Sequence, residues 1–525
     1  MNLRNAISIL VLGLASLLGV TTANAKAFYV AASSGRNAGG TSCNDALSVA
    51  WFNNSSSWGS SSHQISTGTT VFLCGRFSGA AGQQLLAVQG NGVTIKFALG
   101  AILSAPYWAT SGAINIDNRS NVVVDGGTNG VIENTQNGTG RAYQKPTVAI
   151  HAVSCTGCTV QNLTIQNLYV RASNTDYAPD HTSHCVFWLN ANQLTINNIT
   201  CHDACWAIAG YGNNFTLANS NIYHVDHGVA SGPAQKSGGY NIHNNHFHDF
   251  ANWDSPNNNY HHDAIHLWGQ NGATVTSGAI YNNTFDGDFG RNITAHIFLQ
   301  DSIQNMAVYN NVFATSVTRT INSLWFGARS TSMPGGPAIG NSAYNNSINA
   351  GGHQSGSGIF ADAQVNFTAV NNILAGGSAD ISIQGGGTRS STGINHNIYR
   401  DLFADFGDSN TFGWQRATYH YLSAWQNACR CDSASKLITG ARTAVFSSVT
   451  APNAGLAASA SASLDGGVLP AAGPVDTATT ELLSTVGQGG GLNLSDIARD
   501  ALAALAKDKN GKDRPTSGPW NIGPY

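Results

Sequence analysis

The chain has 525 residues, of which only 10% are charged, and its formal net charge is −3 at pH 7. Typical soluble domains carry roughly 25% charged residues. Without a basic excess, a nucleic acid or an anionic membrane surface is excluded as the main partner. Apolar residues make up 42% of the chain and recur in alternating runs, which excludes disorder and favours a folded β-protein.

Residues 1–25 have the pattern of a secretory signal peptide. Arg4 supplies the positive start, residues 6–20 form the apolar run, and Ala23-Asn24-Ala25 is a small-residue cleavage site. Thr21 ends the run before the ~20 apolar residues that a membrane span needs. We therefore expect a cleaved leader, a secreted or periplasmic protein and no membrane span.

Nine cysteines in an exported chain predict disulfides. The pairs closest in sequence are Cys43 with Cys74, Cys155 with Cys158 and Cys201 with Cys205. The spacing for a four-ligand zinc site is absent, so we expect disulfides rather than zinc.

Residues 26–110 are expected to form an N-terminal cap and the first coils of a solenoid. Short strands are predicted at residues 28–32, 70–74 and 93–97, separated by Gly-rich turns. A cap is needed because an open solenoid end exposes both its core and a strand edge.

Residues 111–402 repeat a short unit, an apolar residue next to an Asn-Asn pair or a variant of it. Copies centre on Asn167, Asn198, Asn245, Asn283, Asn311, Asn346, Asn372 and Asn397. The recurring Asn side chains can hydrogen-bond from coil to coil along a ladder, which would satisfy buried polar groups. This periodicity predicts a β-solenoid.

A second strand follows each Asn unit, and its alternation fixes which side chains point inward. The predicted inward column consists of Val186, Cys205, Val229, Ile265, Ile297, Leu324, Ile359 and Ile381. The next residue of each strand then points outward: Phe187, Trp206, Ala230, His266, Phe298, Trp325, Phe360 and Ser382.

The two ends of the mature chain carry a resemblance to a known family. Phe28-Tyr-Val-Ala and Val71-Phe-Leu-Cys-Gly open it, and residues 456–467, 508–515 and Trp520-Asn-Ile-Gly-Pro-Tyr525 close it. With the coil pattern, these segments resemble bacterial right-handed parallel β-helix proteins of the pectate-lyase-like superfamily. The resemblance implies an all-β, right-handed parallel β-helix with an irregular C-terminal extension at residues 403–525. It also implies a polysaccharide substrate, cleaved or epimerised in a groove along one parallel sheet.

Ionisable side chains gather in one part of the predicted helix, around the stretch from Tyr260 to Trp268. Twelve of the 17 histidines fall between His181 and His296. Two positions before the inward column, four successive coils place ionisable groups in one row: His184, Asp203, His227 and Asp263. His266 and His296 lie beside this row. Such a row suits an acid and a base that share one site.

Substrate-binding candidates surround this row. The aromatic side chains Phe187, Trp206, Phe298 and Trp325 would form a groove floor for sugar rings, flanked by Trp268. The same aromatics could instead be a patch covered by a loop. Lys236 and Arg291 are the two basic residues of the region and could neutralise an acidic sugar.

These features leave three functions open. Lyase-type β-elimination, with His227 or His266 as base, is slightly favoured. In an inverting hydrolase, Asp203 and Asp263 would lie two coils apart, roughly 9.6 Å, at the upper edge of the ~6.5–9.5 Å carboxylate separation. The third is a non-catalytic glycan-binding surface solenoid. The sequence assigns no cofactor, although Asp286 and Asp288 could bind Ca²⁺ and mixtures of His and Asp suit zinc or other transition metals. A monomer is expected.

Overall fold

The structure is a computed structural model. It describes residues 26–35, 37–138, 140–169, 182–254, 261–291, 293–315, 322–327, 338–349, 356–375, 379–384, 393–395, 397–400, 412–414, 417–419, 421–433 and 435–438. The predicted signal peptide and most of the predicted C-terminal extension lie outside the described residues.

The chain winds through three parallel ladders of strands, in the order first, second, third in each coil. Strands of the first ladder are β1 (Ala27–Ala31), β3 (Thr70–Leu73), β6 (Thr94–Phe97), β9 (Val123–Asn134), β11 (Thr159–Gln166), β13 (Thr195–Asn197), β15 (Thr216–Ala218), β17 (Ser237–His243), β20 (Val275–Tyr281), β23 (Ile303–Tyr309), β26 (Ala338–Ile339), β27 (Ser342–Tyr344), β30 (Gln364–Val365), β31 (Thr368–Val370) and β34 (Gly393–Asn395).

The second ladder contains the later parts of β9 and β11 and the first parts of β14 (Thr200–Asn213) and β16 (Asn221–Ser231). Its other members are β4 (Arg76–Ser78), β7 (Ile102–Ala105), β18 (His246–His248), β21 (Thr284–Gly287), β24 (Val312–Thr315), β28 (Ser347–Asn349), β32 (Ile373–Ala375), β35 (Ile398–Arg400) and β38 (Lys436–Ile438).

The third ladder holds the later parts of β14 and β16. It also contains β5 (Leu86–Ala87), β8 (Ile114–Asn115), β10 (Thr147–Val153), β12 (Ser183–Asn192), β19 (His262–Trp268), β22 (Ile293–Gln300), β25 (Asn322–Phe326), β29 (Ser357–Asp362), β33 (Ala379–Gln384) and β36 (Phe412–Trp414). Because successive coils add their strands to these three ladders in parallel, the predicted parallel β-helix is confirmed.

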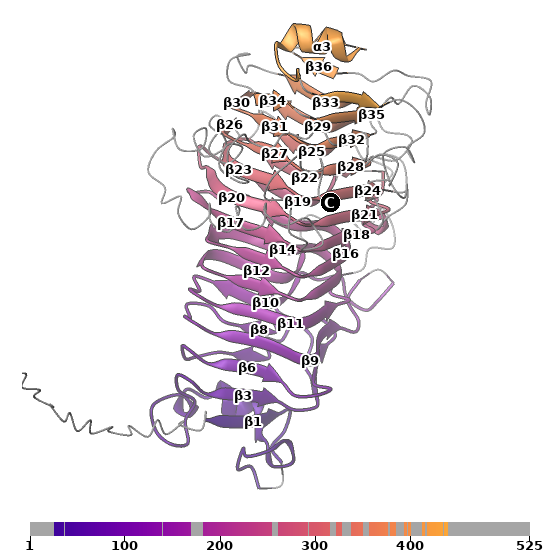
Figure 1. The fold of residues 1–525 in the computed structure, drawn as a ribbon. Coiled ribbons are helices and arrows are strands. Elements are labelled where there is room, and N and C mark those ends of the chain that lie inside the picture. Colours follow the sequence, from indigo (N-terminus) through magenta and orange to yellow (C-terminus); the bar gives the residue numbers. More distant parts are fainter. Residues whose placement is uncertain are drawn as a thin grey trace, which may run out of the picture.

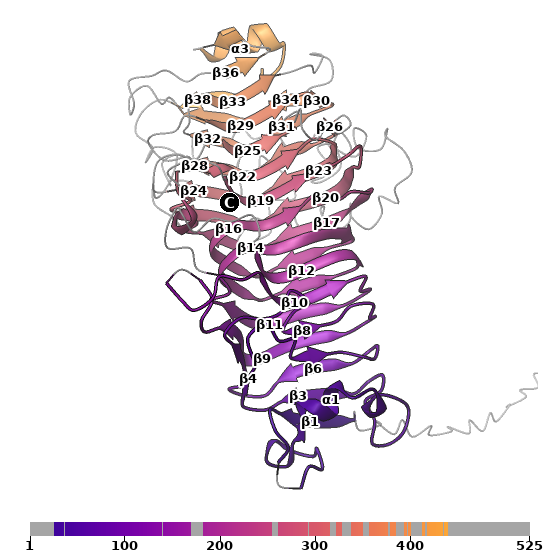
Figure 2. The same ribbon diagram turned by 180° about the vertical axis from the view of Figure 1, so that it is seen from behind.

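The coils stack into an elongated body, with β1 at one end and the helix α3 (Leu422–Cys429) at the other (Figure 1; from behind, Figure 2). Near β1 lie the short strand β2 (Leu47–Ser48), the helix α1 (Val49–Asn53) and the 3₁₀ turns Cys43–Asp45 and Ser55–Ser57. A third 3₁₀ turn spans Ala251–Trp253, and β37 (Ala417–Tyr419) runs antiparallel to β36. The interior is one continuous core of buried aliphatic and aromatic side chains.

The predicted asparagine ladder is confirmed in the coils from Asn245 to Asn397. Asn167 and Asn198 were also predicted but lie outside it, at left-handed turns with φ of 57° and 53°. The first Asn of each pair turns the chain: Asn244, Asn282, Asn310, Asn345 and Asn371 all have φ between 53° and 58°. The second Asn is buried and donates from Nδ2 to the Oδ1 of the next coil, at 3.0–3.1 Å, through Asn245, Asn283, Asn311, Asn346, Asn372 and Asn397. The pair works because Asn tolerates the left-handed region and also carries both a donor and an acceptor.

The cysteine predictions are partly correct. The Cys43–Cys74 disulfide is confirmed. The predicted Cys201–Cys205 pair is wrong, because Cys201 is bonded to Cys185 of the preceding coil. Cys155 and Cys158 are both buried and are not joined in a disulfide. A further disulfide links Cys429 to Cys431.

Among the described residues, none of the helices has the length and the apolar composition that a membrane span requires.

Candidate active site

The inward column of the third ladder has the predicted members except in one coil. Val186 lies opposite Ile208 in the next coil, and Ile208 lies opposite Val229. The column then continues as Ile265, Ile297, Leu324, Ile359 and Ile381, as predicted. Cys205 was therefore the wrong choice, three residues too early, since β14 needs these residues to turn from the second ladder into the third.

This shift removes Asp203 from the row of ionisable groups. Trp206, not Asp203, lies opposite His227, which lies opposite Asp263. Asp203 occupies the corner of its coil, with φ of 55°, like His224 with φ of 51° in the next coil. There its carboxylate accepts a 2.6 Å hydrogen bond from His202 Nδ1. The prediction that Asp203 shares a site with Asp263 is wrong.

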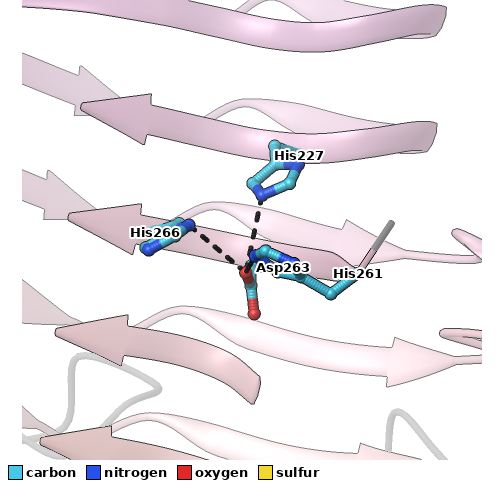
Figure 3. Close-up of side chains that lie close together, drawn as sticks. All are labelled: His227, His261, Asp263 and His266. Atoms are coloured by element: carbon cyan, nitrogen blue, oxygen red, sulfur yellow. Dashed lines mark ion pairs between the residues drawn. The ribbon is translucent and has the colours of Figure 1, made fainter. Parts of the chain in front are cut away.

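Two residues of the row, His227 and Asp263, form a compact cluster with His261 and His266 (Figure 3). We call these four residues the His–Asp cluster. His227 comes from β16, and the other three come from β19 and the residue before it. Asp263 Oδ2 lies 3.5 Å from His227 Nε2, 3.2 Å from His261 Nε2 and 3.4 Å from His266 Nδ1. The Asp263 side chain is fully buried, whereas 47% of the His261 side chain is exposed.

Hydrogen bonds from outside orient two of these imidazoles. Asp226 Oδ2 lies 2.7 Å from His227 Nδ1, and Gln300 Oε1 lies 2.9 Å from His266 Nε2. The opposite ring nitrogens of both histidines therefore face Asp263. The other oxygen of Asp263, Oδ1, accepts a 2.9 Å hydrogen bond from the Ala295 amide.

A second set of charged groups supports the cluster from behind. His262 bridges two carboxylates, Asp226 at 2.9 Å and Asp254 at 3.1 Å. Arg291 forms an ion pair with Asp254 at 3.3 Å. His262 and Asp226 lie between this pair and the His–Asp cluster, so Arg291 does not contact the cluster through it. Lys236 is an exposed residue immediately before β17.

Burial and charge set the protonation of the cluster. Burial opposes the charged form of His227, but Asp226 and Asp263 outweigh it and raise the His227 pKa to about 10. Burial lowers the His266 pKa to about 3, helped by the charges of His227 and His261. The pKa of Asp263 lies below its usual range despite burial, because His261, His227 and His266 surround it. The cluster thus pairs carboxylate with imidazolium while His266 stays neutral.

An aromatic row extends from the cluster along the third ladder. The His266 ring stacks on Phe298 at 4.7 Å, Phe298 contacts Trp325 at 4.6 Å, and Trp325 contacts Phe360 at 5.2 Å. His266 and Phe298 are almost buried, while Trp325 and Phe360 keep partial exposure.

One of the predicted aromatic positions differs, that of Trp206. Ala209 occupies the place predicted for Trp206, opposite Phe187. Trp206 instead lies beside His227, with ring centroids 5.4 Å apart, and its Nε1 donates to Asp226 at 3.3 Å. Trp268 packs against the His266 ring at 4.6 Å and against Trp206 at 6.4 Å. Both tryptophans therefore wall the cluster rather than extend the row.

His184 lies at the far side of Trp206. Its Nδ1 lies 2.9 Å from the Trp206 carbonyl oxygen, and its ring stacks on Phe187 at 5.5 Å. Burial lowers its pKa to about 4. His184 is thus next to the row but is not a member of the His–Asp cluster.

His296 points to the other side of its strand. It is fully buried among Phe285, Phe289 and Phe313, which belong to the core. Neither ring nitrogen has a hydrogen-bond partner among the described residues. The prediction that His296 lies beside the outer row is wrong, because the strand bends as it enters the third ladder and reverses the simple alternation.

A pH-dependent stability test follows from this position. Burial lowers the His296 pKa from 6.5 to about 3. Since the unfolded chain takes up a proton near pH 6.5 and the folded one does not, stability is lost as pH falls from 6.5 towards 3. We expect His296→Leu to lessen this loss. The measurement is the melting temperature at about pH 7 and at about pH 4.5; parallel pH curves for variant and parent would contradict it.

The weak Ca²⁺ candidates have other partners. Asp286 accepts from His246 Nε2 at 2.7 Å, and Asp288 Oδ1 accepts from the Gly290 amide at 2.8 Å. In the described part of the chain, the group of side chains arranged to hold a metal ion is the His–Asp cluster. These two aspartates are not part of it.

Sequence reasoning missed His261, Asp226 and Gln300 as site residues. Asp226 immediately precedes the predicted His227, and His261 lies two residues before the predicted Asp263, next to His262. Adjacent ionisable residues at a coil corner were a usable signal. No sequence signal points to Gln300, because only the stacking of β22 on β19 brings it to His266.

No family model matches the sequence, and no curated protein matches it. Among solved structures, the surface adhesin PfbA of Streptococcus pneumoniae is similar, with 13% identity over 63% of this chain and 89% of that chain (TM-score 0.43). The pectate lyase Pel9A is 14% identical over 71% and 79% (TM-score 0.35). The lacto-N-biosidase of Eubacterium ramulus is 12% identical over 71% and 64% (TM-score 0.37). Each likeness is distant.

Proposed function

We propose that this protein cleaves a polysaccharide bound along the outer face of the third ladder, by β-elimination at an acidic sugar. One observation supports it most: His266 belongs both to the His–Asp cluster and to the aromatic row. A chain stacked on the partly exposed rings of Trp325 and Phe360 would be directed along the ladder towards the reacting groups. Sugar rings stack their C–H faces on such aromatic surfaces.

Elimination needs two chemical functions, and the cluster region contains groups for both. A positive charge must neutralise the uronate carboxylate, so that the C5 proton becomes acidic. A base then takes this proton, the electron pair forms the C4–C5 double bond, and the glycosidic oxygen leaves C4 with a proton. Imidazoles suit both the charge and the proton transfer. Their contact with solvent is through His261, the exposed member.

Hydrolysis by inversion is less well supported. It requires two carboxylates that face each other across the scissile bond, and the predicted pair of Asp203 and Asp263 is not in one row. Asp226 is engaged by His227, His262 and Trp206. Asp263 is therefore the single carboxylate among the four residues of the His–Asp cluster.

The test is incubation of the purified protein with a panel of acidic and neutral polysaccharides. Elimination gives unsaturated products that absorb in the ultraviolet, which is the expected result. Reducing ends without this absorbance would indicate a hydrolase. Binding without either product would indicate a glycan-binding solenoid.

We propose that the protein acts outside the cytoplasm, since its three disulfides suit an oxidising compartment.

Truncating the aromatic row should weaken substrate binding. We expect Trp325→Ala to raise KM by about 10-fold while kcat changes little, because a lost ring contact of the size seen at binding hot spots costs about 1–2 kcal/mol. The matched control is Tyr29→Ala. Tyr29 is also a partly exposed ring, stacked on Phe72 at 4.8 Å, but it lies in β1 at the far end of the helix. An equal rise in KM in both variants would remove the aromatic row from the proposal.

A further inference from the structure

The spacing inside the His–Asp cluster is unusual for a set of hydrogen bonds. Three imidazole nitrogens approach the same oxygen, Asp263 Oδ2, at 3.2–3.5 Å. Charge-assisted hydrogen bonds between nitrogen and carboxylate are about 2.7–2.9 Å long. Elsewhere in this chain, His227 and Asp226 reach that length, at 2.7 Å. Asp263 Oδ2 is buried and makes no hydrogen bond among the described residues.

The same distances match two ligands of one metal ion. Zn²⁺ binds nitrogen and oxygen at about 2.0–2.1 Å, so neighbouring ligands at the corners of a tetrahedron lie about 3.4 Å apart. The three Asp263 distances fall around this value. All four ligand atoms lie within 4.8 Å of one another.

The groups behind the cluster supply a second, independent observation. Histidines that bind a metal ion through one nitrogen hold the other nitrogen against a carboxylate or a carbonyl oxygen. His227 has Asp226 in this position and His266 has Gln300. Both imidazoles are thereby held with their free nitrogen towards Asp263 Oδ2, as Figure 3 shows.

We propose that His227, His261, Asp263 and His266 bind one divalent transition-metal ion of the zinc class. Three imidazoles and one carboxylate favour such an ion over Ca²⁺ or Mg²⁺, which prefer oxygen ligands. The site lies on the outer face of the helix, and the exposed edge of His261 gives an ion or a substrate group access to it.

Ion binding at the His–Asp cluster does not depend on the proposed function, whereas the catalytic role of the ion does. If the protein is a lyase, the ion supplies the positive charge that faces the uronate carboxylate. The ion would lower the pKa of a water molecule that enters as a fifth ligand, and this water would serve as the base for the C5 proton. The four side chains would hold the ion and would not transfer the proton themselves.

The test uses the purified full-length protein, stripped with a chelator and dialysed against Zn²⁺ or Co²⁺. We expect one equivalent of bound metal by elemental analysis, and visible absorption from bound Co²⁺. His261→Ala should weaken Zn²⁺ binding by at least about 100-fold, because one ligand is lost. Gln300→Leu, which removes only the outer hydrogen bond, should weaken it by about 10–100-fold.

His246→Ala is the matched control. His246 has a similar exposed fraction, 43%, and also lies against a carboxylate, Asp286 at 2.7 Å, but outside the cluster. It should bind metal like the parent, and circular dichroism should show that all variants fold. Absence of bound Co²⁺ in the parent, or equal loss in His246→Ala and His261→Ala, would overturn the site. Metal binding without glycan cleavage would refute only the proposed lyase function. Full cleavage by the metal-free protein would refute only the catalytic role of the ion.

Discussion

Replacing Asp263 with Asn should lower the turnover of an acidic polysaccharide by about 10³-fold, because the cluster imidazoles lose the carboxylate that sets their charge and orientation for catalysis. The substitution keeps the size of the side chain and the Oδ1 acceptor for the Ala295 amide. It removes the negative charge that three histidines surround within 3.5 Å. The measurement is the initial rate of unsaturated product formation at saturating substrate.

Asp203→Asn is the control that separates the site from the ionisable residues nearby. Asn tolerates the left-handed backbone of this corner, at φ of 55°, and the same charge is removed. We expect turnover close to that of the parent. A comparable loss in both variants would mean that Asp203 acts in the reaction despite its distance from the row, and would revive the two-carboxylate mechanism.

Replacing Asn311 with Leu should lower the free energy of unfolding by about 4 kcal/mol. Asn311 Nδ2 donates to Ile280 O at 2.9 Å and to Asn346 Oδ1 at 3.1 Å, and its Oδ1 accepts from Asn283. Leu has a similar volume but makes none of these hydrogen bonds, and each buried group left without a partner costs about 1–3 kcal/mol before relaxation. The measurement is denaturant-induced unfolding followed by tryptophan fluorescence.

Asn197→Leu provides the comparison for the asparagine ladder. Asn197 is partly exposed, and its side chain accepts one hydrogen bond from Asn219, at 2.8 Å on the surface. We expect a change below about 0.5 kcal/mol, as for most surface substitutions. If Asn311→Leu were equally mild, the ladder would be a by-product of the fold rather than a source of its stability.

The sequence by itself determined the parallel β-helix and most of its register. The Asn pairs carry two separate signals, a left-handed turn at Asn310 and a buried amide at Asn311. Both depend on the chemistry of a single residue type, so they can be recognised without neighbours in space. The aliphatic column from Val229 to Ile381 was equally readable, because an alternating strand must bury one face.

Only the tertiary structure decided which charged residues meet. The number of residues used to turn a corner varies from coil to coil, so the place of Asp203 relative to Asp263 cannot be counted along the chain. The bend that starts the third ladder likewise sends His296 into the core and Asp263 outward. The His–Asp cluster joins side chains of β16 with those of β19 and the residue before it, and His227 and His261 are 34 residues apart in sequence. The predicted register already placed His227 next to Asp263, with His266 beside them. The stacking of the coils added His261 to this group, and the course of each corner removed Asp203 and His296.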